Sequence, residues 1–139
     1  MDPVQHTSRP AYDLARVKAC TASGRYRLGG RQACLQHLEA HLAGEVWRYG
    51  EFAERVVEAL TEADFHDSRP WPEPGGQLAD EYGIALPDAI LEDFGVKVRN
   101  WYVKLHLQQD RRGELVMFMS LHPLAFDMRR SGGLLRAGV

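Results

Sequence analysis

The chain has few cysteines and no long apolar run, and these absences exclude several classes of protein. Only Cys20 and Cys34 occur in 139 residues, in neither a CxxC nor a Cys/His spacing, so we expect buried free thiols rather than a zinc site or disulfide framework. No stretch reaches the roughly 18 consecutive apolar residues of a membrane span. The residues from Met1 to Gln5 lack the basic-then-apolar order of a secretory signal, which predicts a cytoplasmic protein.

Motifs for nucleotides, metals and serine nucleophiles are also missing. The pairs Gly29-Gly30 and Gly132-Gly133 match neither the Walker nor the dinucleotide fingerprint, and no GxSxG elbow is present. His37 and His41 have a helical spacing that can bind metal, but no HExxH frame or carboxylate pattern completes it. The sequence therefore predicts neither a metal nor a cofactor.

The formal net charge of −2 conceals three blocks of different sign. Residues 1–35 carry six basic and two acidic side chains, residues 36–94 three basic and fourteen acidic, and residues 95–139 eight basic and three acidic. If the two basic ends meet in the fold, they form a positive face that attracts phosphate or an acidic partner. Alternatively, the charge blocks only solvate helices.

Apolar residues recur at helical spacing in the first sixty positions. This periodicity predicts helices over 12–23, over 32–43 and from about residue 50 to 60. Thr61, with Asp64 three residues later, predicts a capping turn that delivers Phe65 into the core. Segment 66–76 contains three prolines and two glycines, which predicts a long surface loop. Segments 77–83 and 87–94 are ambiguous, the latter fitting either a helix turn or an edge insertion.

The period changes from helical to alternating in the last third of the chain. Alternation over 96–108, turn residues over 109–114 and an apolar run over 115–121 predict an antiparallel hairpin. Helices first and a hairpin last predict an α+β fold, with N-terminal helices packed on a C-terminal antiparallel sheet. We expect one domain over 1–139, with loose termini at 1–10 and 131–139, although Leu134 and Leu135 can dock.

The turn residues also predict the register of this hairpin. Asp110 and Gly113 favour a three-residue loop over 111–113, so that Asp110 faces Glu114. Opposed residue numbers then sum to 224. This sum sets Lys104 against Ser120 and Tyr102 against His122, whereas a one-residue change in loop length turns His122 to the other face.

Tyr, Lys and His gathered on one sheet face can cleave a phosphodiester without metal. Histidine titrates near neutral pH, lysine stabilises charge on the phosphoryl oxygens, and tyrosine donates a hydrogen bond or proton. RNA supplies its own nucleophile, the 2′-OH. The alternative is that these are ordinary surface residues of a half-buried strand.

Six short sequence motifs follow one another between residues 12 and 122. They are Tyr12-Asp13-Leu14-Ala15-Arg16-Val17-Lys18, Arg25-Tyr26-Arg27, Leu60-Thr61-Glu62-Ala63-Asp64-Phe65, Asp80-Glu81-Tyr82, Tyr102-Val103-Lys104-Leu105 and Ser120-Leu121-His122. Their succession resembles the MqsR-type toxins of bacterial toxin–antitoxin systems. The resemblance implies a RelE-like α+β fold, ribosome-independent mRNA endoribonuclease activity and neutralisation by a cognate antitoxin protein that also binds DNA.

The same resemblance implies roles for individual residues. Tyr102 matches the family's catalytic tyrosine, and His122 falls where the family has a lysine on its terminal strand. Two positions depart from the family pattern: Asp67 stands in place of a catalytic lysine, and Ala79 in place of a glutamine, with Gln77 two residues earlier. The candidate catalytic residues are Tyr102, His122 and Lys104, and the candidate substrate-binding residues are His66, Arg69, Gln77, Tyr82 and Arg99.

Three classes of function compete for this sequence. The first is an RNA-cleaving toxin whose partners are RNA and an antitoxin, with no membrane and no small-molecule cofactor. The second is a non-catalytic module that keeps the fold and binds RNA or protein. The third, a small metabolic enzyme with a metal site, lacks any motif. In the first, His122 and Tyr102 exchange protons with the RNA while Lys104 and nearby arginines hold the phosphate.

Overall fold

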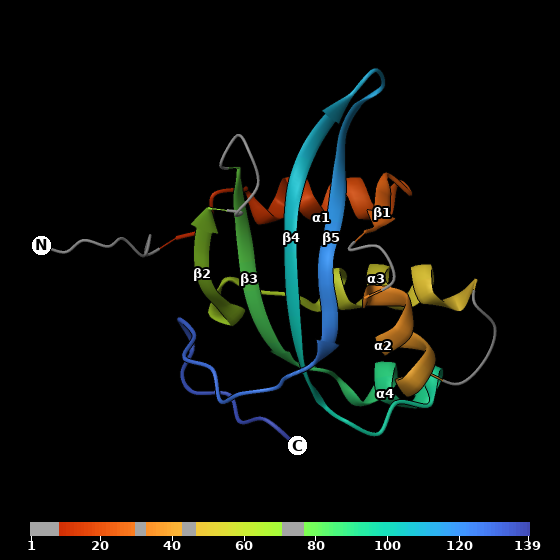
Figure 1. Ribbon diagram of the computed structural model, residues 1–139, viewed down its shortest axis with the longest axis vertical. Coiled ribbons are helices and arrows are strands. Elements are labelled where there is room, and N and C mark those ends of the chain that lie inside the picture. The colour runs from red at the N-terminus through yellow and green to blue at the C-terminus, as the bar shows by residue number, and fades with distance from the viewer. Residues whose placement is uncertain (1–8, 30–32, 43–46, 71–76) are drawn as a thin grey trace, which may run out of the picture.

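The computed structural model describes residues 9–29, 33–42, 47–70 and 77–139, and its fold class is α+β, as predicted. The helices are α1 (Leu14–Ala22), α2 (Ala33–His41), α3 (Arg48–Ala59), the short 3₁₀ helix η1 (Glu62–Asp64) and α4 (Asp88–Phe94). The strands are β1 (Tyr26–Leu28), β2 (Phe65–Pro70), β3 (Leu78–Ala85), β4 (Asn100–Asp110) and β5 (Gly113–Pro123). Figure 1 shows α1 and α3 behind one five-stranded sheet.

The sheet has the strand order β1-β5-β4-β3-β2 and is mixed rather than purely antiparallel. Strand β1 pairs with β5 in parallel, whereas the other neighbours are antiparallel. The expectation of an antiparallel sheet is therefore wrong at this edge. Strand β1 has only three residues, which are too few for an alternation to be recognised in the sequence.

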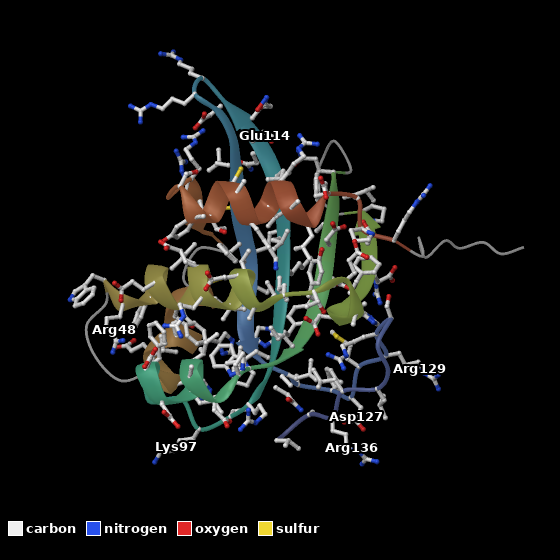
Figure 2. The ribbon with its side chains drawn as sticks, turned by 180° about the vertical axis from the view of Figure 1, so that it is seen from behind. Arg48, Lys97, Glu114, Asp127, Arg129 and Arg136 are labelled. Atoms are coloured by element: carbon white, nitrogen blue, oxygen red, sulfur yellow. The ribbon has the colours of Figure 1, made fainter. Side chains whose placement is uncertain are left out.

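The core lies between the sheet and the helices α1 and α3, both of which cross the same face (Figure 2). Val17 of α1 and Val56 of α3 are fully buried. Phe52 of α3 meets the Trp101 ring of β4 edge-on, with 5.0 Å between ring centroids. These helices confirm the predicted segments 12–23 and 50–60, and α2 lies within the predicted segment 32–43. Helical periodicity identified them because their apolar stripes face a large sheet.

The capping turn after α3 is also confirmed. The Thr61 amide donates to Asp64 Oδ2 at 2.8 Å, and the chain then delivers Phe65 into the core, where it is 2% exposed. Asp64 Oδ1 in turn accepts a bond from Arg130 Nη1 at 3.0 Å, which ties this turn to the C-terminal segment. The turn thus fixes where β2 begins.

The middle of the chain corrects two expectations. The predicted loop over 66–76 is wrong for residues 66–70, because these form most of β2, paired antiparallel with β3. Pro70 is tolerated because β2 is an edge strand and Pro70 is its last residue. Residues 71–76, the rest of that prediction, lie outside the described residues. The ambiguous segments become β3 and α4, and α4 ends at Gly95 with φ +66°.

The hairpin β4–β5 has the predicted register near its base but not at its turn. Tyr102 pairs with His122 and Lys104 with Ser120, as expected. At the turn, however, Asp110 pairs with Gly113 rather than with Glu114, and β4 begins at Asn100 rather than at residue 96. A bulge between the Lys104 and Leu105 pairs inserts one extra residue in β5, which compensates for the shorter loop.

The C-terminal segment is packed, so the expectation of a loose tail over 131–139 is wrong. Met128 and Leu135 exchange two backbone hydrogen bonds of 2.8 Å, and the Val139 carbonyl accepts from the amides of Arg99 and Asn100. Leu135 packs in a small cluster with Leu124 and Met128. Of the other predicted loose end, residues 1–8 lie outside the described residues.

The two basic ends of the chain do meet, but acidic residues accompany them. Arg25 pairs with Asp110 at 2.6 Å, and Arg16 pairs with Glu114, which Figure 2 labels near the hairpin turn. This contact therefore neutralises charge instead of building a uniformly positive face.

Cys34 is buried and Cys20 half-buried, and both are free. No helix in the described part of the chain has the length and apolar character needed to cross a membrane.

A pair of neighbouring leucines tests whether the C-terminal segment contributes to stability. Leu135→Ala removes a buried side chain and is expected to lower the free energy of unfolding by about 2 to 3 kcal/mol. Leu134→Ala changes a side chain that is 54% exposed and is expected to change the free energy of unfolding by less than about 0.5 kcal/mol. Urea denaturation followed by circular dichroism measures both, and equal losses would contradict the packing described.

Candidate functional site

A pocket of about 320 Å³ lies where the sheet meets the C-terminal segment. Strands β2, β3, β4 and β5 contribute only polar side chains to it, and residues 124–128 contribute apolar side chains and Asp127. Because side chains alternate along a strand, Tyr102 faces away from its core-facing neighbours Trp101 and Val103. The pocket is therefore on the sheet face opposite α1 and α3. It is lined by His66, Arg69, Glu81, Tyr102, His122, Leu124, Ala125, Phe126, Asp127 and Met128.

Tyr102 and Glu81 form a hydrogen-bonded pair across β4 and β3. Tyr102 Oη donates to Glu81 Oε2 at 2.9 Å, and Glu81 is only 7% exposed. Burial, together with the adjacent Glu81 carboxylate, raises the pKa of Tyr102 well above its ordinary value. Tyr102 therefore keeps its proton at neutral pH and acts as a hydrogen-bond donor.

Arg69, which lines the pocket, contacts the buried carboxylates of Asp67 and Glu81. Its Nε donates to Asp67 Oδ2 at 2.9 Å and lies 3.4 Å from Glu81 Oε1. Asp67 is 1% exposed, and its other oxygen accepts from the Ser68 amide at 2.8 Å. About half of the Arg69 side chain is exposed, and Arg69 lines the pocket, so an anion in the pocket can approach the guanidinium. The carboxylate at position 67 thus anchors an arginine.

His122 stands in a row of three rings that runs from α2 to β4. Its ring centroid lies 4.9 Å from that of His37 and 5.0 Å from that of Tyr102. Because a carbonyl only accepts, Nδ1 is the donor in the 2.8 Å bond to the Pro123 oxygen. Burial lowers the pKa of His122, and His37 lowers it further, although the Pro123 bond opposes both. At neutral pH the ring is therefore neutral, with Nε2 as its basic nitrogen.

His66 has the same arrangement on the other edge of the site. Its Nδ1 donates to the Arg129 carbonyl, and its Nε2 lies 3.9 Å from Glu81 Oε1. When His66 is protonated, this contact is an ion pair. Both histidines that line the pocket therefore commit Nδ1 to a backbone carbonyl and keep Nε2 for chemistry.

The described residues contain one group that could hold a metal ion, formed by His66, Asp67 and Glu81, whose ligand atoms lie within 4.8 Å of one another. Arg69 already bridges the two carboxylates, so its guanidinium supplies the positive charge that a metal would bring. An ion could bind there only if Arg69 moved away. The rings of His37 and His41 contact different residues, His122 and Trp101.

Two predicted substrate-binding residues have structural roles instead. Tyr82 is fully buried on the helix side of β3, where its ring meets that of Phe65 at 5.7 Å. Arg99 donates to the Leu86 carbonyl and to Asp88 Oδ1, both at 2.6 Å, and does not line the pocket. Both interpretations are corrected. Tyr82 has the parity of the buried face of β3, which could not be assigned before that strand was recognised.

Lys104 and Gln77 lie near the site without lining it. Lys104 is half-buried on the same face as Tyr102, where its backbone pairs with Glu81 of β3 and Ser120 of β5. Gln77 is exposed and directly precedes β3, and Ala79 is buried opposite Arg69. Of the eight predicted site residues, the pocket brings together Tyr102, His122, His66 and Arg69.

Sequence reasoning missed Glu81 and Phe126. Glu81 lies one residue before Tyr82 and has the opposite parity, so recognition of β3 as a strand would have brought it to the open face. Phe126 lies in an irregular segment, for which periodicity gives no signal.

Comparison of the chain with protein-family models and with curated proteins finds no match.

The lowered pKa of His122 has a consequence for stability. Between the folded pKa and the ordinary value of about 6.5, the unfolded chain binds a proton at His122 that the folded chain refuses, so folding is weakened as pH falls. The stability advantage of wild type over His122→Asn should therefore shrink from pH 7 to pH 5. Urea denaturation of both proteins across this range measures the difference. A constant or growing advantage would contradict it.

Proposed function

We propose that this pocket cleaves single-stranded RNA without a metal ion, by attack of the 2′-OH on the adjacent phosphate. The observation that carries the proposal is the pair of histidines, His66 and His122, each with Nδ1 bound to a carbonyl and Nε2 left available. They line the same pocket as an arginine and a tyrosine that keeps its proton. This set can move two protons and stabilise a phosphoryl group.

His122 is the general base in this mechanism. Its lowered pKa keeps Nε2 unprotonated at neutral pH, which suits a group that accepts the proton of the 2′-OH. The bond from Nδ1 to Pro123 and the stacking on Tyr102 fix the plane of the ring. Burial thus keeps the base unprotonated, and these two contacts orient it.

His66 is the general acid, and Glu81 orients it. The 2′ oxygen bonds to phosphorus as the bond from phosphorus to the 5′ oxygen breaks. The 2′-OH proton passes to His122 Nε2, and a proton from His66 Nε2 passes to the leaving 5′ oxygen. The products are a 2′,3′-cyclic phosphate and a 5′-OH. Glu81 Oε1 lies 3.9 Å from His66 Nε2 and orients the ring for this step.

Arg69 and Tyr102 hold the phosphoryl oxygens in the transition state. The guanidinium is already oriented by Asp67 and Glu81, so its terminal nitrogens need little reorganisation to meet an anion. Tyr102 Oη donates its one proton to Glu81 in the free protein, and it would turn that proton to a phosphoryl oxygen when RNA binds. We assign the phosphate to Arg69 rather than to Lys104, because Lys104 does not line the pocket.

The resemblance to the MqsR-type toxins supports the same class of reaction. Their catalytic tyrosine matches Tyr102, and the histidine paired with it in the sheet takes the place of their lysine. On this reading the substrate is cytoplasmic mRNA, and a cognate antitoxin protein neutralises the activity. Growth arrest on induction, relieved by co-expression of a neighbouring gene, is the corresponding test in cells.

Cleavage of a long mixed-sequence RNA in EDTA tests the reaction directly. Wild type is expected to produce 2′,3′-cyclic phosphate ends. His122→Ala should slow cleavage by about 10²- to 10⁴-fold, because it removes the general base. Glu81→Gln should also slow it, whereas Glu92→Gln, on the exposed side of α4, serves as the matched control and should cleave as wild type does.

Three results would count against the proposal. Wild-type protein that is folded by circular dichroism and leaves the RNA intact would favour a non-catalytic binding module of the same fold. Cleavage that survives in His122→Ala would remove His122 from the mechanism, and cleavage that requires added divalent metal would replace Arg69 with an ion at the two carboxylates.

A further inference from the structure

The pocket has two unlike walls. The side chains from the sheet are polar or ionisable, whereas residues 124–128, which we call the apolar wall, contribute Leu124, Ala125, Phe126 and Met128, with Asp127 among them. A ligand that fills this pocket must therefore have an anionic or polar part and a flat or apolar part. A nucleotide is such a molecule, with a phosphate at one end and an aromatic base at the other.

The apolar wall is fixed at both ends. The Leu124 amide donates to the Asn100 carbonyl at 2.9 Å, and Met128 exchanges two 2.8 Å backbone bonds with Leu135. Asp127 Oδ1 also accepts from the Ala137 amide at 2.9 Å. The side chains of Leu124 and Met128 are buried. The wall thus holds its position without help from the residue at its centre.

Phe126, at that centre, is 80% exposed. The other large apolar side chains that are exposed in the described part of the chain, Leu35, Trp47, Leu134 and Val139, do not line the pocket. Leaving a phenylalanine ring in water forgoes the favourable free energy of burying it. A ring displayed on a fixed wall beside an arginine and two histidines offers its face to a ligand.

We propose that Phe126 is the stacking platform for a nucleobase of the RNA, next to the phosphate held by Arg69. This inference rests on the proposed function and adds to it a base-binding subsite. Aromatic rings stack on unpaired bases of single-stranded RNA and tolerate different bases, since every base has a π-face. The pocket volume of about 320 Å³ is at the small end of ligand sites, which suits one nucleotide rather than a duplex.

Charge explains why the platform matters for affinity. Two buried carboxylates, Asp67 and Glu81, lie beside Arg69, so this site attracts a polyanion far less than a basic groove does. Stacking then supplies affinity that phosphate contacts alone do not. RNA binding is therefore expected to depend only weakly on salt. The slope of the logarithm of the binding constant against the logarithm of the salt concentration should correspond to about one or two neutralised phosphates.

Titration with nucleoside 3′-monophosphates, with inorganic phosphate as reference, tests the platform without catalysis. Wild type should bind the 3′-monophosphates of adenosine and uridine more tightly than inorganic phosphate. Phe126→Ala should weaken nucleotide binding by about 5-fold or more and leave phosphate binding unchanged. Phe126→Trp should restore it. Leu134→Ala, which removes an exposed leucine of the same segment outside the pocket, is the matched control. Calorimetry in EDTA measures all four proteins.

The outcomes separate this inference from the proposed function. Equal nucleotide affinity in Phe126→Ala and wild type, or nucleotides that bind no better than phosphate, would overturn the platform and point to a protein segment as the partner of Phe126. Phe126-dependent nucleotide binding without RNA cleavage would keep the platform and remove the catalysis. Cleavage by wild type with an unchanged kcat/KM in Phe126→Ala would keep the catalysis and remove the platform.

Discussion

The pairing of β4 with β5 is the interaction on which the site depends. Its bulge changes the alternation of β5, because Phe118 and Leu121, three residues apart, both face the core. Continued strict alternation from Phe118 would have turned His122 towards the core. The extra residue instead sets His122 beside Tyr102 on the open face. A local irregularity in one strand thus decides which chemistry the sheet presents.

Charge compensation is the second constraint. Carboxylates as buried as Asp67 and Glu81 are costly unless they are paired and hydrogen-bonded. Arg69 contacts both, and Tyr102 donates to Glu81, so the network is satisfied by the same groups that a phosphate would meet. Substrate binding therefore competes with, and is oriented by, an existing set of hydrogen bonds.

The parts of the fold that sequence reasoning found are those with local signals. The periodicity of α1 and α3 and the turn residues of the hairpin lie within short windows. Strand β1 and the packed tail were missed because their partners are distant in the sequence, as Val116 is from Tyr26 and Asn100 from Val139. Strand β2 was missed because the prolines and glycines of 66–76 predicted a loop. The Tyr102 and His122 pair was found although the turn was wrong, because the shorter loop and the bulge offset one another. Glu81 was missed because only its partners make a buried glutamate stable.

The bulge in β2 has a consequence for how copies of the chain behave toward one another. An unpaired strand at the rim of a sheet is a template for aggregation. Here the register of β2 slips between Phe65 and Asp67, the Phe65 carbonyl accepts from the Ser131 amide at 2.9 Å, and Pro70 closes the strand. The irregularity that turns His66 toward Glu81 therefore also prevents a strand of a second molecule from pairing along this edge of the sheet. Straightening this strand would expose the protein to edge-to-edge association.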